Sequence, residues 1–197
     1  MGRNRLEAFS DGVIAIIITI LVLNLKTPTD PTLRSLAQMW PAFSVYGLSF
    51  VTVAIYWVNH HHLIHLARHV DGRLLWSNIN LLFWMSLLPW VTGYLGENHA
   101  LQLPVALYGA IALACAHSFH WLSEAVAKQH PSHQALNQKM RRKGWVAQGI
   151  YLLALAAVFI WVPLALILIA LPPLMYFMPD RRIEQMVAPE AGRPDTH

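Results

Sequence analysis

The sequence has a single cysteine, Cys115, and few charged residues. One cysteine cannot build a disulfide framework within the chain, and it cannot supply a thiolate cluster for a metal ion. Charged residues make up 12% of the chain, whereas an ordinary soluble domain contains about 25%. Hydrophobic residues make up 56%. This composition excludes an ordinary soluble domain and indicates an integral membrane protein.

The sequence also lacks a small-residue cleavage site after its first apolar stretch, where "LNLKTPTDPT" leads straight into the next one. We therefore expect no removable signal peptide. Apolar stretches that can cross a hydrocarbon layer of ~30 Å, or nearly so, lie at residues 8–25, 36–58, 74–95, 101–123, 145–161 and 163–178. The prediction is an all-α membrane protein with six spans in residues 1–179. The apolar pattern ends there, and residues 180–197 are expected to form a cytoplasmic tail.

The lysines and arginines lie mainly in alternate connections between these spans. They include Arg3, Arg5, Arg68, Arg73, Lys128, Lys139, Arg141, Arg142, Lys143, Arg181, Arg182 and Arg193. The remaining connections carry only two basic residues, Lys26 and Arg34, together with the acidic Asp30 and Glu97. Because basic residues stay on the cytoplasmic side, both termini should be cytoplasmic in a multi-pass protein of the cell membrane. The basic surplus then faces anionic lipid headgroups, and no nucleic-acid partner is expected.

The first span, "RLEAFSDGVIAIIITILVLNL", begins with polar residues. An ionisable residue such as Asp11 is costly inside a membrane helix and needs a polar partner. The sequence offers Arg5 at the same helix end. It also offers the cluster "YWVNHHH" in the second span, which contains Trp57 and His61. Bonds of this kind would hold the first helix against its neighbours.

The apolar half of this span carries one stripe of mixed character. At about 100° per residue, Gly12, Ile16, Thr19 and Leu23 fall within an arc of about 60°, and Ile18 lies about 100° or more away from each of them. Two interpretations stay open at this point. Any apolar helix contains such a stripe, and a threonine can bond the carbonyl four residues back. Alternatively, the stripe lines a path for ions.

The first helix carries a family resemblance. "RLEAFSDGVIAI" resembles the R-x-x-x-F-S-D signature that opens the first helix of the transmembrane protein 175 family, the endolysosomal potassium channels and their prokaryotic relatives. Arg5, Phe9, Ser10 and Asp11 occupy the signature positions. "WPAFSVYGLSFVTVAIYWVNHHHL" and "NINLLFWMSLLPWVTGYLG" resemble the second and third helices of that family. The resemblance covers residues 3–96 most clearly.

This resemblance implies a non-canonical cation channel without enzymatic activity or a bound cofactor. First helices of the family line a central pore, and the polar signature locks them to the second and third helices. Prokaryotic members resemble one six-helix repeat and form homotetramers. By position, the hydrophobic constriction falls on Ile16 and a hydroxyl layer on Thr19. Gly12 lies on the same stripe of the pore-lining helix. Leu23 stands where the family accepts several apolar residues, and we expect a second constriction there. The permeant ions would be potassium and, to a lesser degree, other monovalent cations.

Histidine spacing leaves a metal- or haem-binding membrane protein as an alternative. Pairs three or four residues apart can ligate on one helix face, and such pairs are His61 with His65, His65 with His69, and His117 with His120. The simpler interpretation expects no metal. In it, the histidines of the second span meet the helix dipole, donate hydrogen bonds to Asp11, or face water.

A secondary cation transporter is the other alternative. Such proteins favour ion-binding carboxylates near the middle of the membrane and inverted repeats. No acidic residue lies at mid-depth in the predicted spans, since Asp11 and Glu124 lie towards span ends. Passive, uncoupled ion flux would distinguish a channel from a transporter.

Overall fold

The computed structural model describes residues 2–129 and 134–177, and the regular secondary structure in them is helical throughout. The all-α prediction is thus confirmed, and the predicted tail at 180–197 lies outside the described residues. The helices are α1 (Arg3–Leu23), α2 (Leu33–Gln38), α3 (Trp40–Leu66), α4 (Gly72–Ser86), α5 (Leu88–Glu97), α6 (Gln102–Ala127), α7 (Gln134–Val158) and α8 (Val162–Phe177).

Four helical stretches in the described part of the chain are long and apolar enough to cross a membrane. They are α1, α3, α4 with α5, and α6. α8 is apolar but shorter. Leu87 separates α4 from α5, directly before the turn that holds Pro89. Proline has no N–H to continue the helical ladder and crowds the preceding turn, which explains the break.

Several helix boundaries differ from the sequence prediction, and α7 begins at Gln134 rather than at residue 145. α1 begins at Arg3 rather than at residue 8, and α3 runs from Trp40 to Leu66 rather than over 36–58. Both helices extend through polar segments that the apolar pattern excluded. These segments stay helical because their side chains bond to one another across the two helices, as described below. The same bonds help to hold α1 against α3.

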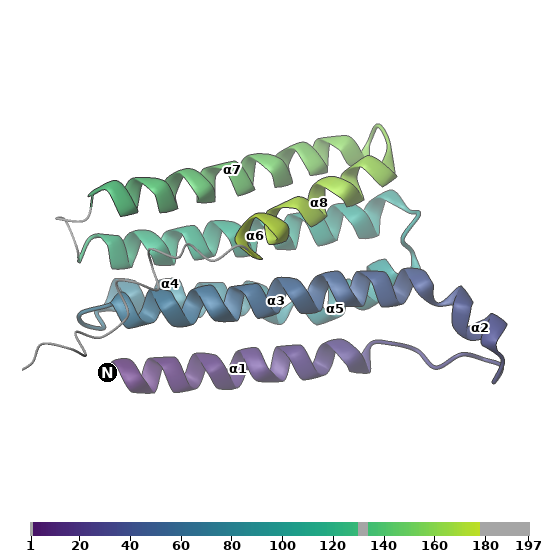
Figure 1. Ribbon diagram of the computed structural model, residues 1–197, viewed down its shortest axis with the longest axis horizontal. Helices are drawn as coiled ribbons and strands as arrows, with labels where there is room; N and C mark the ends of the chain where they lie inside the picture. The colour runs from purple at the N-terminus through teal and green to yellow at the C-terminus, as the bar shows by residue number, and fades with distance from the viewer. Residues whose placement is uncertain (1, 130–133, 178–197) are drawn as a thin grey trace, which may run out of the picture.

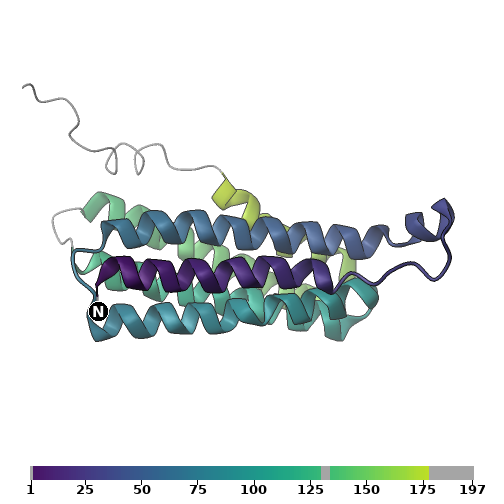
Figure 2. The same cartoon turned by 90° about the horizontal axis from the view of Figure 1, so that it is seen from below.

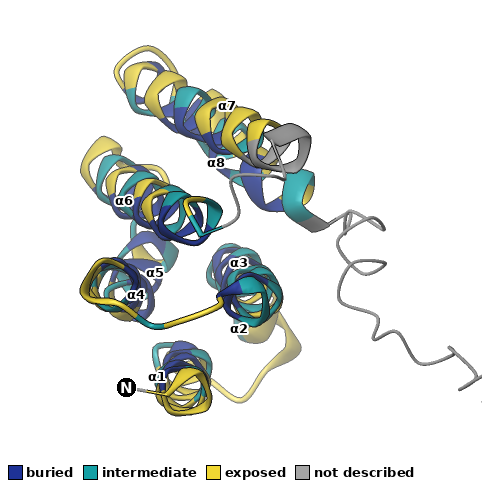
Figure 3. Ribbon diagram, turned by 90° about the vertical axis from the view of Figure 1, so that its left-hand side faces the viewer, coloured by how far each residue is buried: buried dark blue, intermediate teal, exposed yellow. Residues whose placement is uncertain are grey.

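The helices run nearly parallel to one axis and are stacked in successive layers (Figure 1). α1 forms one side of the molecule, α3 lies beside α4 and α5 in the next layer, and α7 lies on the opposite side (Figure 3). α1 packs on α3, α4 and α5. Seen from below, it runs along the bundle between α3 and α4 (Figure 2). α1 is therefore a peripheral helix of the single subunit.

Polar side chains join the helices behind α1. Thr92 on α5 donates a hydrogen bond to Ser49 on α3 at 2.7 Å, and the Ser49 hydroxyl lies 2.9 Å from the hydroxyl of Tyr108 on α6. Asn80 on α4 donates to Ser118 on α6 at 2.6 Å. In a membrane the hydrophobic effect does not drive helices together, so such bonds and close packing hold them. α3 to α6 thus form a bonded platform on which α1 rests.

Candidate functional site

α1 has two distinct faces in the subunit. The face towards the platform is buried and consists of Leu6, Ser10, Ile14, Ile17 and Leu21. The spacing of three or four residues keeps them on one side of the helix. The opposite face is exposed and points away from the other helices (Figure 3). Although both faces are mostly apolar, only one is used to build the subunit.

The predicted stripe lies on the exposed face. Gly12 and Thr19 are exposed, Ile16 is 59% exposed and Leu23 is 79% exposed. A Cβ atom added at Gly12 would meet nothing within 4 Å. These residues therefore do not fill the core of the subunit. The stripe is free to face a water path, lipid or a second subunit.

Thr19 uses its hydroxyl proton within its own helix. The hydroxyl donates to the Ile16 carbonyl oxygen at 2.8 Å, three residues back rather than four. Because the proton is engaged, the lone pairs of the Thr19 oxygen remain as acceptors on the exposed face. Such an oxygen can accept from water or coordinate a cation.

A fully buried polar network holds the other face of α1. The side-chain amide of Asn78 on α4 donates to the Ser10 hydroxyl at 2.9 Å, and Ser10 donates to the Leu6 carbonyl at 2.8 Å. The Asn78 carbonyl oxygen lies 2.6 Å from Nε2 of His60 on α3, so this nitrogen carries the proton and donates. Ser10, His60 and Asn78 have no solvent exposure. One residue from each of three helices thus meets at one point.

Asp11 lies at the edge of this network. Its partner is Trp57 on α3, whose indole Nε1 donates to Asp11 Oδ1 at 3.0 Å. A bond to the Trp57–His61 region was one of the two partners expected from the sequence. Among the described residues, no ion pair joins Arg5 to Asp11. Phe9 is 55% exposed and takes no part in the buried network.

The histidines of α3 bond to Glu7 on α1, and the expected bond from these histidines to Asp11 is not formed. Nδ1 of His61 lies 2.9 Å from Glu7 Oε1, and Nε2 of His65 lies 3.1 Å from the same oxygen. Next to them, the Arg3 guanidinium donates to the His65 carbonyl at 3.2 Å. α3 is thus joined to α1 directly at two heights, by His61 and His65 to Glu7 and by Trp57 to Asp11. A third link is indirect, because His60 reaches Ser10 only through Asn78 on α4.

The other spaced histidine pairs do not converge. α3 ends at Leu66, so His69 leaves the helical register of His65, and its backbone bonds Gln129. His117 bonds the Gln148 side chain at 3.1 Å. The His120 ring instead lies against Trp145, with ring centroids 5.2 Å apart. Of the predicted ligand pairs, only His61 and His65 remain together with a third ligand group.

Asn78 is not predicted from the sequence as part of this network, whereas His60 belongs to the "YWVNHHH" cluster and Glu7 to the polar start of the first span, without their observed partners. His60 is the first of three consecutive histidines, and helical spacing from Trp57 places it and His61 three and four residues further along the same side. Asn78 is an amide in an otherwise apolar span, a residue type that joins membrane helices. Both signals were present in the sequence, but neither identifies its partner.

Comparison with known proteins finds similarity to proteins named as potassium channels. The family model described as endosomal/lysosomal potassium channel TMEM175 matches residues 5–89. A protein of Chryseobacterium sp. (strain P1-3) named as a potassium channel is 40% identical over 187 residues, covering 94% of this chain and 97% of that protein. A potassium channel of Chamaesiphon minutus is 32% identical over 170 residues, covering 79% and 84%.

The match to animal proteins is shorter. The human endosomal/lysosomal proton channel TMEM175 is 34% identical over 96 residues, which is 42% of this chain and 19% of the human protein. Among solved structures, the crystal structure of a lysosomal potassium-selective channel TMEM175 homolog from Chamaesiphon minutus has a TM-score of 0.79 and 29% identity. This structural match covers 89% of this chain and 96% of the Chamaesiphon chain.

Proposed function

Because the chain belongs to the TMEM175 family, we propose that it is a potassium-permeable channel of the cell membrane with a pore lined by α1. The names of its bacterial relatives and the fold of the Chamaesiphon channel homolog support this proposal. The observation that carries it is the two-faced α1. One face is bonded into the platform, and the other exposes the Gly12–Leu23 stripe. The family is a channel family, and we propose no enzymatic activity.

We infer that the working unit is a homotetramer with both termini in the cytoplasm. One helix per subunit can surround a water path only when several copies meet around an axis. The peripheral position of α1 in the bundle supports such an arrangement (Figure 1). In this proposal each subunit crosses the membrane six times. The six spans are α1, α3, the joined pair α4–α5, α6, α7 and α8.

The proposed conduction path follows the stripe from Gly12 to Leu23. At about 1.5 Å per residue this stripe is roughly 16 Å long. Ile16 side chains from the subunits would form an apolar ring that excludes water when narrow, and Thr19 oxygens would replace part of the hydration shell of a potassium ion one turn further along. Leu23 would form a second apolar ring, while Gly12 leaves room on the cytoplasmic side.

Recording from the purified protein in planar bilayers under opposing potassium and sodium gradients tests this function. We expect passive current without coupling to a second ion, and a reversal potential displaced towards that of potassium. Absence of current from a correctly assembled protein would refute the channel. Flux that requires a coupled ion in fixed ratio would instead support a secondary transporter.

A further inference from the structure

The cytoplasmic ends of α1 and α3 bring three metal-ligating groups together. Glu7 Oε1, His61 Nδ1 and His65 Nε2 all lie within 4.8 Å of one another. The two histidines are one helical turn apart, and their ring centroids are 4.4 Å apart. Glu7 comes from the other helix. This group of three is not the sole link of α1 to its neighbours, because Ser10 and Asp11 bond α4 and α3 as well.

We propose that Glu7, His61 and His65 form a binding site for a divalent transition metal ion such as Zn²⁺. Two imidazole nitrogens and one carboxylate oxygen are a ligand set that zinc accepts, with water in the fourth position. Zinc–ligand bonds of about 2.0–2.2 Å place neighbouring ligand atoms of a tetrahedral site about 3.4 Å apart. The Glu7 oxygen lies 2.9 Å and 3.1 Å from the two histidine nitrogens, close to this value, and the two nitrogens lie within 4.8 Å of each other.

Exposure and charge around the three ligands also fit a cation. The side chains of His61 and His65 are 43% and 34% exposed, so an ion and its water can enter. Glu7 and Asp11 contribute negative charge on the same side of α1, whereas Arg3 at the His65 carbonyl opposes a cation. The nitrogen ligands favour zinc, copper or nickel over magnesium or calcium.

A metal ion at this position would tie the pore-lining helix to α3. Glu7 lies nine residues before Ile16, which is about 13 Å along the helix. The ion would restrict any rotation or shift of α1 against α3, and opening of an apolar ring at Ile16 requires α1 to move. Zinc is therefore expected to reduce the current. This effect rests on the proposed function, whereas the binding of zinc does not.

Zinc titration by calorimetry tests the site directly. The probe is ZnCl₂ added to tag-free, chelator-washed full-length protein in detergent. The wild type should bind one Zn²⁺ per subunit with micromolar affinity. Glu7→Gln and His65→Ala, on different helices, should each weaken binding by about tenfold or more. Lowering the pH from about 7.5 to about 5.5 should also weaken it, because protons compete for the imidazole nitrogens.

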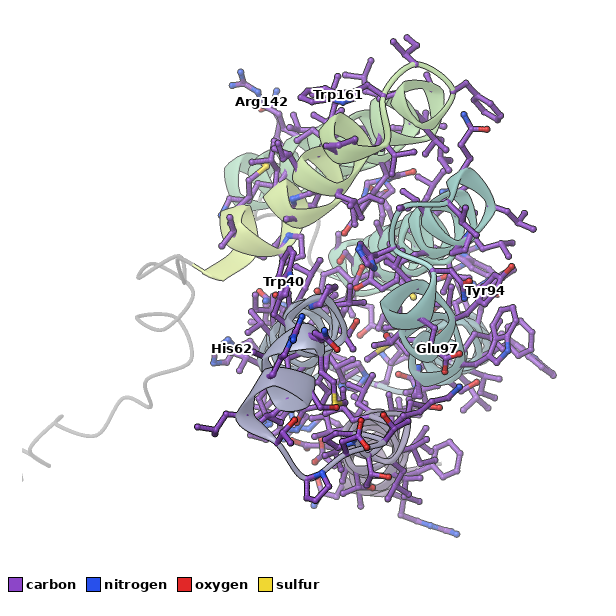
Figure 4. All side chains as sticks on the ribbon, turned by 90° about the vertical axis from the view of Figure 1, so that its right-hand side faces the viewer. Trp40, His62, Tyr94, Glu97, Arg142 and Trp161 are labelled. Carbon is purple, nitrogen blue, oxygen red and sulfur yellow. The ribbon has the colours of Figure 1, made fainter. Side chains whose placement is uncertain are left out.

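His62→Ala is the matched control. His62 neighbours His61 in the sequence, but its side chain points away from the bundle (Figure 4). This variant should bind zinc like the wild type. Absence of binding at about 100 µM Zn²⁺, or equal loss in His62→Ala and His65→Ala, would overturn the site. Light scattering in chelator verifies the assembly of each variant. Zinc binding by a protein that carries no current would support the site and contradict the proposed function.

Discussion

Replacing Ile16 with asparagine should raise the current several-fold and lower the preference for potassium over sodium. In the proposed tetramer, four branched side chains around the axis exclude water from a narrow ring. Asparagine is similar in size but supplies hydrogen-bonding groups, so the ring would hydrate. A hydrated ring no longer requires ions to shed water, and discrimination between them falls. Bilayer recording under potassium and sodium gradients measures both quantities.

Ile167→Asn on α8 is the matched control for this substitution. Ile167 is 57% exposed and Ile16 is 59% exposed, so the same change is made at equal exposure in the subunit. Ile18, on the same helix, does not serve this purpose because it is half-buried against the core. Ile167→Asn should leave conductance and reversal potential unchanged. If Ile16→Asn also leaves both unchanged in an assembled protein, Ile16 does not form the constriction.

Replacing Asn78 with alanine should disrupt the attachment of α1 and with it the assembly. The change removes the amide oxygen that accepts from His60 Nε2 and the amide nitrogen that donates to Ser10. Leaving buried polar groups unpaired costs about 1–3 kcal/mol for each group. The wild type should have the mass of four subunits by light scattering in mild detergent. Asn78→Ala should yield mainly smaller or aggregated species and a lower thermal midpoint.

Asn59→Ala provides the comparison within α3. Asn59 is half-buried, and its amide bonds the Ile55 carbonyl of its own helix, so its loss removes no hydrogen bond between helices among the described residues. Asp11→Ala should have an intermediate effect, because its partner Trp57 is 44% exposed. Equal tetramer yield and equal thermal midpoint for Asn78→Ala and Asn59→Ala would show that the buried network does not hold α1. A monomeric wild type would contradict the tetramer itself.

The sequence predicts the helical class and the stripe on α1, but not which face of α1 packs. Leu6 and Ile14 are buried, whereas Ile16 and Leu23 are exposed, yet these residues are chemically alike. A membrane helix that is apolar on all sides gives little amphipathic signal. Its orientation follows from bonds at its polar end, through Ser10 above all, and these depend on residues more than 40 positions away.

The partners of the polar residues were predictable only in part. The Asp11 bond to Trp57 lay within the expected region, because the indole is the strong donor near the end of the second span. The histidines were expected near Asp11 but contact Glu7, one helical turn earlier. Which turn of α1 faces which turn of α3 is set by how far the helices extend. The apolar pattern placed the end of the second span eight residues too early.

Thiol modification of Thr19→Cys tests most directly the central claim that the exposed face of α1 lines the ion path. The wild type has one cysteine, Cys115, which is buried, and should not respond to a charged, water-soluble methanethiosulfonate reagent applied on both sides of the bilayer. Such reagents attack thiolates in water and spare thiols in lipid. In conducting Thr19→Cys channels, the positively charged group that the reagent attaches at position 19 should block most of the current. Leu153 on α7 is 63% exposed, and the current of Leu153→Cys channels should be insensitive to the reagent. Conducting Thr19→Cys channels whose current the reagent leaves unchanged would contradict the account.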